Sequence, residues 1–264
     1  MALVEGELTG IIKCAAFDVH NDLGFGLPED AYQRGMELAL KNVGLVVTPK
    51  RRVVISHGGV EVVELFPDLI VEDRVVVELK AIREEFAQAH FVQLFTYLKA
   101  GGIRVGKLIN FGRERVADER LVFDEKPTVV KEDWSEVKDK VVGETRNTLQ
   151  GIRQALLEVG ERHGLGYGDA TYRRIVEVAM AQRKLAFAAN PLAKIALQGQ
   201  PLGDFSLDCF LVPSQAICSI HALKDGLSNF DLARARSFAR NLGVTFGVIA
   251  NFGKAELDIR GVAT

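Results

Sequence analysis

The chain has 264 residues, of which 48% are hydrophobic and 26% are charged, and its formal net charge is −2. This length and apolar content suit one large or two small globular domains and exclude a disordered chain. The near-neutral charge gives no overall attraction to nucleic acid, so any such binding must use a local patch. Without an apolar run of eighteen residues or a charged-then-apolar leader, we expect no membrane span, no signal peptide and a cytoplasmic location.

The chain has three cysteines, which are Cys14, Cys209 and Cys218. Their number is odd and no pair has CxxC spacing. Both facts argue against a zinc ribbon and against a disulfide framework. We expect reduced thiols, most of them buried.

The first half of the chain predicts two helices and then a sheet. Apolar residues recur at helical spacing from Leu8 to Leu23, where Gly24 ends the pattern, and Pro28 followed by acids begins a second helix that reaches about Val43. Apolar segments separated by turn residues predict strands at 45–48, 53–56 and 60–66. A helix over 84–100 and a strand over 105–111 complete the unit, which ends near residue 123.

The stretch from Phe66 to Ile82 has two apolar runs separated by a polar turn and predicts a β-hairpin. The two-residue period of a strand places Glu78 and Lys80 on one face, and the hairpin brings Asp68 beside them. Two carboxylates and an ammonium suit a divalent metal site better than a core, because Mg²⁺ prefers oxygen ligands and the lysine can hold a water.

Each of these charged residues also has a simpler explanation. Glu78 and Lys80 could form an ion pair at an exposed strand end, and Asp68 after proline could be a turn residue. Glu29 lies in a first helical turn, where an acid favours the helix dipole. The sequence pattern by itself leaves these alternatives open.

The pattern of the first half recurs about 140 residues later. Gly166 to Tyr172 matches Gly26 to Tyr32 at an offset of 140, and the Asn251-Phe252-Gly253 segment matches Asn110-Phe111-Gly112 at an offset of 141. We therefore predict an internal duplication, with a first domain at residues 1–125, a linker at 126–146 that runs into a helix, and a second copy at 147–264.

The second copy lacks the charged face of the first. Asp208 matches Asp68, but Ser219 stands where Glu78 stands and His221 where Lys80 stands. We expect that this copy does not rebuild the site. The hairpin pattern survives without the charges, so the fold does not require them.

The ordered set Gly26-x-x-Glu29-x-x-Tyr32, Asp68 and Glu78-x-Lys80 resembles the GxxExxY proteins, a branch of the PD-(D/E)XK nuclease-like superfamily. The resemblance covers the first copy along its whole length. It implies an α/β (α+β) fold with two tandem restriction-endonuclease-like domains, each a mixed sheet flanked by helices, and we expect them to pack as a pseudo-two-fold dimer.

The resemblance also implies roles for individual residues. Asp68, Glu78 and Glu29 would be the metal ligands for Mg²⁺ or Mn²⁺, and Lys80 would orient the attacking water; these four form the catalytic set. The residues implied for substrate positioning are Gln93, Tyr97, Tyr32 and His20. Both tyrosines could instead be packing residues, and His20 could be a polar residue near a helix end.

The function expected from these features is metal-dependent hydrolysis of phosphodiester bonds in nucleic acid, with DNA favoured over RNA. One intact site predicts cleavage of one strand by a monomeric pseudo-dimer, or of both by a homodimer. The alternative is a non-catalytic nucleic-acid-binding or assembly module that keeps a nuclease fold.

Overall fold

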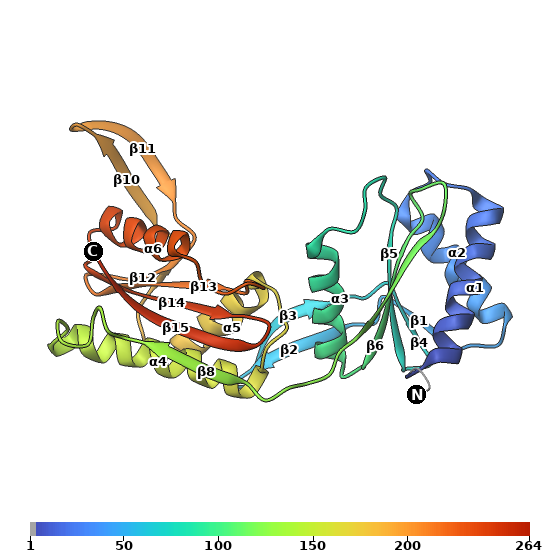
Figure 1. Ribbon diagram of the computed structural model, residues 1–264, viewed down its shortest axis with the longest axis horizontal. Helices are drawn as coiled ribbons and strands as arrows, with labels where there is room; N and C mark the ends of the chain where they lie inside the picture. The colour runs from blue at the N-terminus through green and yellow to red at the C-terminus, as the bar shows by residue number, and fades with distance from the viewer. Residues whose placement is uncertain (1–3) are drawn as a thin grey trace. The chain divides into compact units, whose positions relative to one another are not determined.

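The computed structural model describes residues 4–264, and these divide into two compact units. Among the described residues, unit 1 comprises 4–55 and Val63–Glu125, and unit 2 comprises Ser56–Val62 and Lys126–Thr264. After the additional strand β8 (Val129–Asp133) at the start of unit 2, the two units contain the same kinds of elements in the same order (Figure 1). Each is a mixed α/β assembly, as predicted.

Unit 1 has a five-stranded sheet in the order β1-β4-β5-β6-β7, in which only the β5–β6 pair is parallel. Its elements are α1 (Gly6–Leu23), α2 (Glu29–Asn42), β1 (Val47–Pro49), β4 (Leu69–Val71), β5 (Val75–Lys80), α3 (Gln88–Gly101), β6 (Val105–Asn110) and β7 (Ala117–Val122). A separate two-stranded ribbon is formed by β2 (Val53–His57) and β3 (Val60–Leu65). The tip of this ribbon belongs to unit 2.

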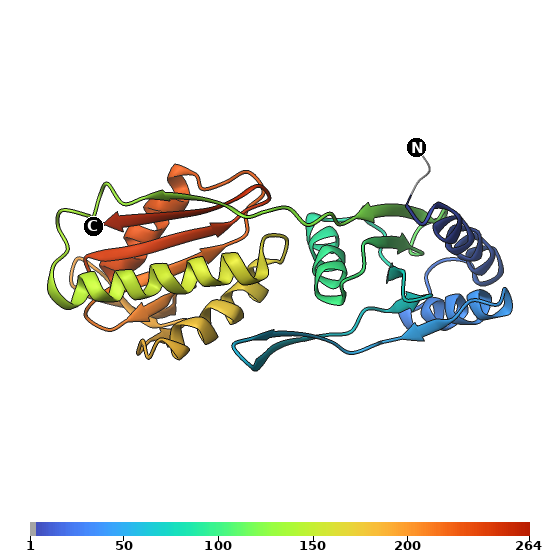
Figure 2. The same cartoon turned by 90° about the horizontal axis from the view of Figure 1, so that it is seen from below.

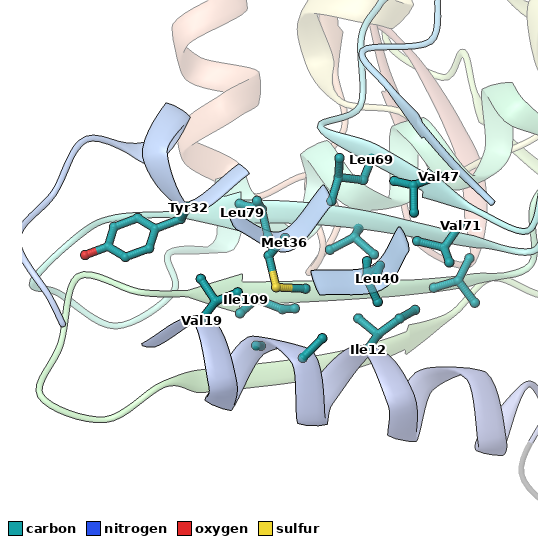
Figure 3. Packing of buried hydrophobic residues seen from close by; sticks show 14 of the residues in the cluster. Ile12, Val19, Tyr32, Met36, Leu40, Val47, Leu69, Val71, Leu79 and Ile109 are labelled. Carbon is teal, nitrogen blue, oxygen red and sulfur yellow. The ribbon is translucent and has the colours of Figure 1, made fainter. Parts of the chain in front are cut away.

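The sheet of unit 1 is covered on both faces, with α1 and α2 on one side and α3 on the other (Figure 1). The side chains of β5 alternate between the two layers: Val77 and Leu79 pack with α1 and α2, and Val76 packs with α3. Figure 3 shows the first layer, where Met36 and Leu40 of α2 meet Ile12 and Val19 of α1 over the sheet. Double coverage explains why β5 is an almost continuous apolar run.

Unit 2 repeats this arrangement with a six-stranded sheet in the order β8-β15-β14-β13-β12-β9. Its elements are β8 (Val129–Asp133), α4 (Gly143–His163), α5 (Asp169–Gln182), β9 (Ala188–Ala189), β10 (Leu192–Leu197), β11 (Gln200–Ser206), β12 (Phe210–Val212), β13 (Ala216–His221), α6 (Asn229–Asn241), β14 (Phe246–Phe252) and β15 (Glu256–Ala263). Helices α4 and α5 lie on one face of the sheet and α6 on the other (Figures 1 and 2).

One prediction on local structure was wrong. The helix expected from residue 84 begins at Gln88, because the buried Asn110 amide bonds the backbone of Ile82 and Glu84 and holds that segment out of a helix. The stretch 126–146, predicted as a linker that runs into a helix, contains β8, which pairs with β15 in the sheet of unit 2, and it ends in the first turn of α4. No helix among residues 4–264 is long and apolar enough to cross a lipid bilayer.

Asn110 is a structural clamp that recurs in unit 2. Its carboxamide oxygen accepts the N–H groups of Ile82 and Gly112 at 3.0 and 2.9 Å. Asn251 makes the equivalent bonds to the backbone of Leu223. The buried asparagine of each Asn-Phe-Gly segment thus joins two neighbouring strands. It ties the end of β6 to the residues that follow β5, and the end of β14 to the residues that follow β13.

We expect Asn110→Ala to destabilise unit 1 by about 3 kcal/mol or more, since it leaves several buried backbone groups without partners. The matched variant Asn251→Ala should destabilise unit 2 by a similar amount. Urea unfolding of both variants measures the loss. A decrease in unfolding free energy below about 1 kcal/mol for both variants would contradict this structural role, because a single ordinary hydrogen bond contributes about that much.

Candidate active site

The hairpin register places the predicted acidic and basic residues together. In the β4–β5 pair Leu69 lies opposite Val77, so the preceding Asp68 lies near Glu78. Asp68, Glu78 and Lys80 share the strand face that is directed toward α3. The carboxylates lie at the end of two strands whose other residues are buried apolar side chains.

Hydrogen bonds fix each member of this cluster. The Lys80 ammonium donates to Glu78 Oε1 at 2.6 Å, and the backbone N–H of Leu79 donates to Asp68 Oδ2 at 2.7 Å. Asp68 and Glu78 are almost fully buried. Burying two carboxylates side by side is costly unless a cation accompanies them, so the arrangement calls for positive charge at this point.

Lys50 also contacts this cluster, although its place in the sequence does not indicate it. Its ammonium donates to Asp68 Oδ1, and its backbone N–H donates to the Asp68 carbonyl at 3.1 Å. Its φ of 46° lies in the left-handed region, which is uncommon for a lysine. In the sequence Lys50 is a lysine that follows Pro49 in a turn between strands. Such lysines are common on protein surfaces, so this pattern does not predict a contact with Asp68.

Glu78 has the most perturbed carboxyl group of the cluster. Burial, together with the neighbouring Asp68 charge, raises the pKa of Glu78 to about 7, although contact with Lys80 opposes the shift. Its Oε2 atom is buried and has no hydrogen-bond partner. A buried carboxylate oxygen without a partner is costly, and this atom is free to accept a cation.

The pKa values of Lys80 and Glu29 are shifted by each other and by the neighbouring Asp68 charge. Burial by itself lowers the pKa of Lys80, but the carboxylates of Glu78, Glu29 and Asp68 outweigh it, and the net pKa is raised. Burial raises the pKa of Glu29; the Lys80 charge is the largest opposing influence, and the Asp68 charge adds to the increase. Glu29, at the first position of α2, therefore lies within electrostatic reach of the cluster.

The predicted positioning residues divide into two pairs. Gln93 and Tyr97 lie on α3, where the Gln93 amide donates to the Tyr97 hydroxyl at 2.9 Å. Burial and the nearby Glu78 carboxylate raise the pKa of Tyr97, so this pair adjoins the cluster. By contrast, the Tyr32 hydroxyl donates to the Gly24 carbonyl at 2.9 Å and its ring stacks on Phe111.

The second member of the outlying pair, His20, is held by backbone carbonyls. Its ring nitrogens lie 3.3 Å from the Gly24 oxygen and 3.2 Å from the Glu114 oxygen. His20 and Tyr32 thus hold together the loop that links α1 to α2. In the structure their polar atoms serve the fold, and a direct contact with substrate stays an untested prediction.

The donors present fit a hard divalent cation. Within residues 4–264 no three histidine, cysteine, aspartate or glutamate side chains gather into a ready metal cage. Mg²⁺ does not need one, because it commonly binds one or two carboxylates and completes its shell with water and substrate phosphate. Asp68 and the unpartnered Glu78 Oε2 supply such donors; Glu29 as a third ligand stays a prediction.

The second copy has no equivalent of this cluster. Ser219 occupies the position of Glu78 on β13 and its buried hydroxyl has no partner. Asp208 is exposed and pairs with Arg173 at 2.8 Å. Burial, with Arg234 nearby, lowers the pKa of His221, so this side chain tends toward neutrality where Lys80 carries a charge. Unit 2 therefore keeps the hairpin without its buried carboxylate pair.

Comparison with known protein families finds one family that matches the chain. The model of the PD-(D/E)XK nuclease superfamily matches residues 6–121 and again residues 146–262. No curated protein matches the chain. A solved structure entitled "Crystal structure of SSO0001" is 22% identical over 46% of this chain and 60% of that chain, with a TM-score of 0.31.

Proposed function

Because the chain belongs to the PD-(D/E)XK nuclease superfamily, we propose that it is a metal-dependent nuclease with one active site, formed by Asp68, Glu78 and Lys80 in unit 1. The observation that carries this proposal is the buried, unpartnered oxygen of Glu78 beside a second buried carboxylate. A purely structural role leaves this costly arrangement without a reason. The assignment to the GxxExxY branch within the superfamily is part of the proposal.

Asp68 and Glu78 would hold Mg²⁺ or Mn²⁺, which when bound supplies a polarised phosphate and a more acidic water. Lys80, already directed to Glu78, is placed to orient the attacking water and to stabilise negative charge on the phosphate. Tyr97, fixed by Gln93, can donate to a phosphate oxygen from α3. Glu29 is a further carboxylate that can accept a proton, since its pKa is raised.

Since unit 2 lacks the carboxylate pair, one chain should cut one strand of DNA. With supercoiled plasmid and Mg²⁺ we expect nicked circles to accumulate before linear product. Agarose electrophoresis over time measures this, and Asp68→Ala is the control that should give neither product. Activity that survives Asp68→Ala would contradict the assignment of the site.

One observation favours the second candidate, a non-catalytic nucleic-acid-binding or assembly module. Both carboxylates already have a lysine partner, since Lys50 contacts Asp68 and Lys80 contacts Glu78. The cluster is thus partly charge-balanced without a metal. DNA binding that is unaffected by Mg²⁺, in a protein that produces no cleavage, would favour this candidate.

A further inference from the structure

The β10–β11 hairpin of unit 2 is an exposed apolar arm. In Figure 1 it extends away from the sheet and past α6. Its two-residue loop, Gln198-Gly199, has φ values of 51° and 80°, as a type I′ turn requires. Four large apolar side chains of the hairpin are exposed: Leu192, Leu197, Leu202 and Phe205. A two-stranded hairpin is marginally stable alone, so such surface indicates a binding contact.

The equivalent hairpin of the first copy, β2–β3, shows what such a tip binds. It corresponds to β10–β11 at an offset of 140, with His57 at the position of Leu197. Its tip, Ser56–Val62, is part of unit 2, where His57 is 2% exposed. His57 Nδ1 lies 3.0 Å from Nε2 of His163 at the end of α4, and Gln182 at the end of α5 donates to the Gly58 carbonyl at 3.0 Å.

Unit 1 has the same receiving surface at the ends of α1 and α2. The same offset places Leu23 where His163 lies, Asn42 where Gln182 lies, and Val43 where Arg183 lies. Leu23 is 42% exposed and Val43 is 60% exposed. Unit 1 therefore has an exposed apolar surface at the position that receives a hairpin tip in unit 2.

The change from a polar to an apolar residue occurs both on the hairpin tip and on the surface that receives it. The polar pair His57 and His163 is replaced by the apolar pair Leu197 and Leu23, and Leu197 is itself 62% exposed. A Cβ at Gly58 would lie 2.1 Å from the end of the Gln182 side chain, so a glycine suits this contact. At the same offset Gln198 stands where Gly58 stands and Asn42 where Gln182 stands, so the larger residue on the tip accompanies the shorter one on the receiving surface.

We propose that the β10–β11 hairpin of one chain docks on the α1–α2 surface of unit 1 in a second copy of this chain, with Leu197 packed against Leu23 and Val43. Tip and receiving surface both belong to this chain, so the partner that they fit is another copy. Each chain carries one tip and one surface, and two chains can close the assembly by mutual exchange. The proposal is independent of the nuclease assignment.

Mixed disulfide cross-linking tests this contact. A Cys14→Ala background removes the exposed thiol, and the two remaining cysteines are buried. Leu197→Cys protein is mixed with Leu23→Cys protein under mild oxidation. We expect a covalent dimer on a non-reducing gel. Ile11→Cys, exposed on the same helix and about 18 Å away, replaces Leu23→Cys as the matched control and should cross-link poorly.

Sedimentation velocity gives the second readout, with circular dichroism to verify folding. The wild-type protein should associate as its concentration rises, and Leu197→Asp or Leu23→Asp should each keep the folded chain monomeric. A wild-type chain that stays monomeric while the mixed pair fails to cross-link would overturn the proposal. A dilute Leu197→Cys/Leu23→Cys double variant that forms only an intrachain disulfide would also overturn it, because the hairpin would then bind its own chain.

Discussion

Glu78→Gln should abolish Mg²⁺-dependent cleavage and at the same time make the metal-free protein more stable at pH 8. The amide removes a charged metal ligand, and lost metal catalysis is worth several kcal/mol, or roughly a thousandfold in rate. It also removes a buried negative charge beside Asp68. A plasmid cleavage assay with Mg²⁺, and urea unfolding without metal, measure the two effects.

The gain in stability depends on pH in a defined direction. The pKa of Glu78 is raised from 4.5 to about 7 in the folded chain. The favourable contribution of its neutral form is therefore complete below about pH 4.5 and is lost as the pH rises through about 7. Ionisation of Glu78 should therefore lower the unfolding free energy of the wild type by roughly 3 kcal/mol over this range. The Glu78→Gln variant has no carboxyl group at this position and should not show this decrease.

Ser219→Ala is the matched control for this experiment, because Ser219 occupies the equivalent position in unit 2. It should leave cleavage unchanged and should not alter the pH dependence of stability. If Glu78→Gln still cleaves DNA, the assignment of the metal ligand is wrong. If its stability falls with pH as steeply as that of the wild type, the inferred burial of charge at Glu78 is wrong.

Lys80→Met should reduce cleavage by about a hundredfold or more while Mg²⁺ binding persists. General acid–base and charge-stabilising groups contribute factors of this size. The metal site loses a neighbouring positive charge, so Mg²⁺ affinity should hold or rise once Glu78 is ionised, at a pH well above its raised pKa. Without Lys80 the pKa of Glu78 should increase further, because the lysine lowers it in the wild type. Single-turnover cleavage rates, with calorimetric titration of Mg²⁺, separate the two effects.

His221→Met is the control for this variant, since His221 holds the place of Lys80 in the second copy. It should change neither the cleavage rate nor Mg²⁺ affinity. Cleavage at the wild-type rate by Lys80→Met would rule out a catalytic role for Lys80. Loss of both cleavage and metal binding would instead assign Lys80 to maintenance of the fold.

The elements around the site could be predicted from local patterns. The two-residue period of β5 correctly places Glu78 and Lys80 on one face, because a strand covered on both sides still alternates between its two layers. The superfamily match to both halves confirms the duplication that the repeated motifs indicate. Within the predicted positioning set, only the pair on α3 adjoins the carboxylates, because Gln93 and Tyr97 share a helix face.

The remaining features depend on contacts between distant parts of the chain. Asn110 delays the start of α3 through bonds to residues 26 and 28 positions earlier, and helical periodicity contains no trace of these bonds. Strand β8 forms because β15, more than 120 residues later, supplies its partner. Lys50 reaches Asp68 from a turn 18 residues away. His20 and Tyr32 contact a loop instead of the carboxylates.

Calorimetric titration of Mg²⁺ into the wild-type chain, Asp68→Ala and Glu78→Gln at pH 8 tests the central claim most directly. At this pH Glu78 is ionised, because its pKa is about 7. The proposed site predicts a binding isotherm for the wild type that disappears in both variants. An absence of binding by the wild type up to millimolar Mg²⁺, or binding that survives in both variants, would contradict a metal site formed by Asp68 and Glu78.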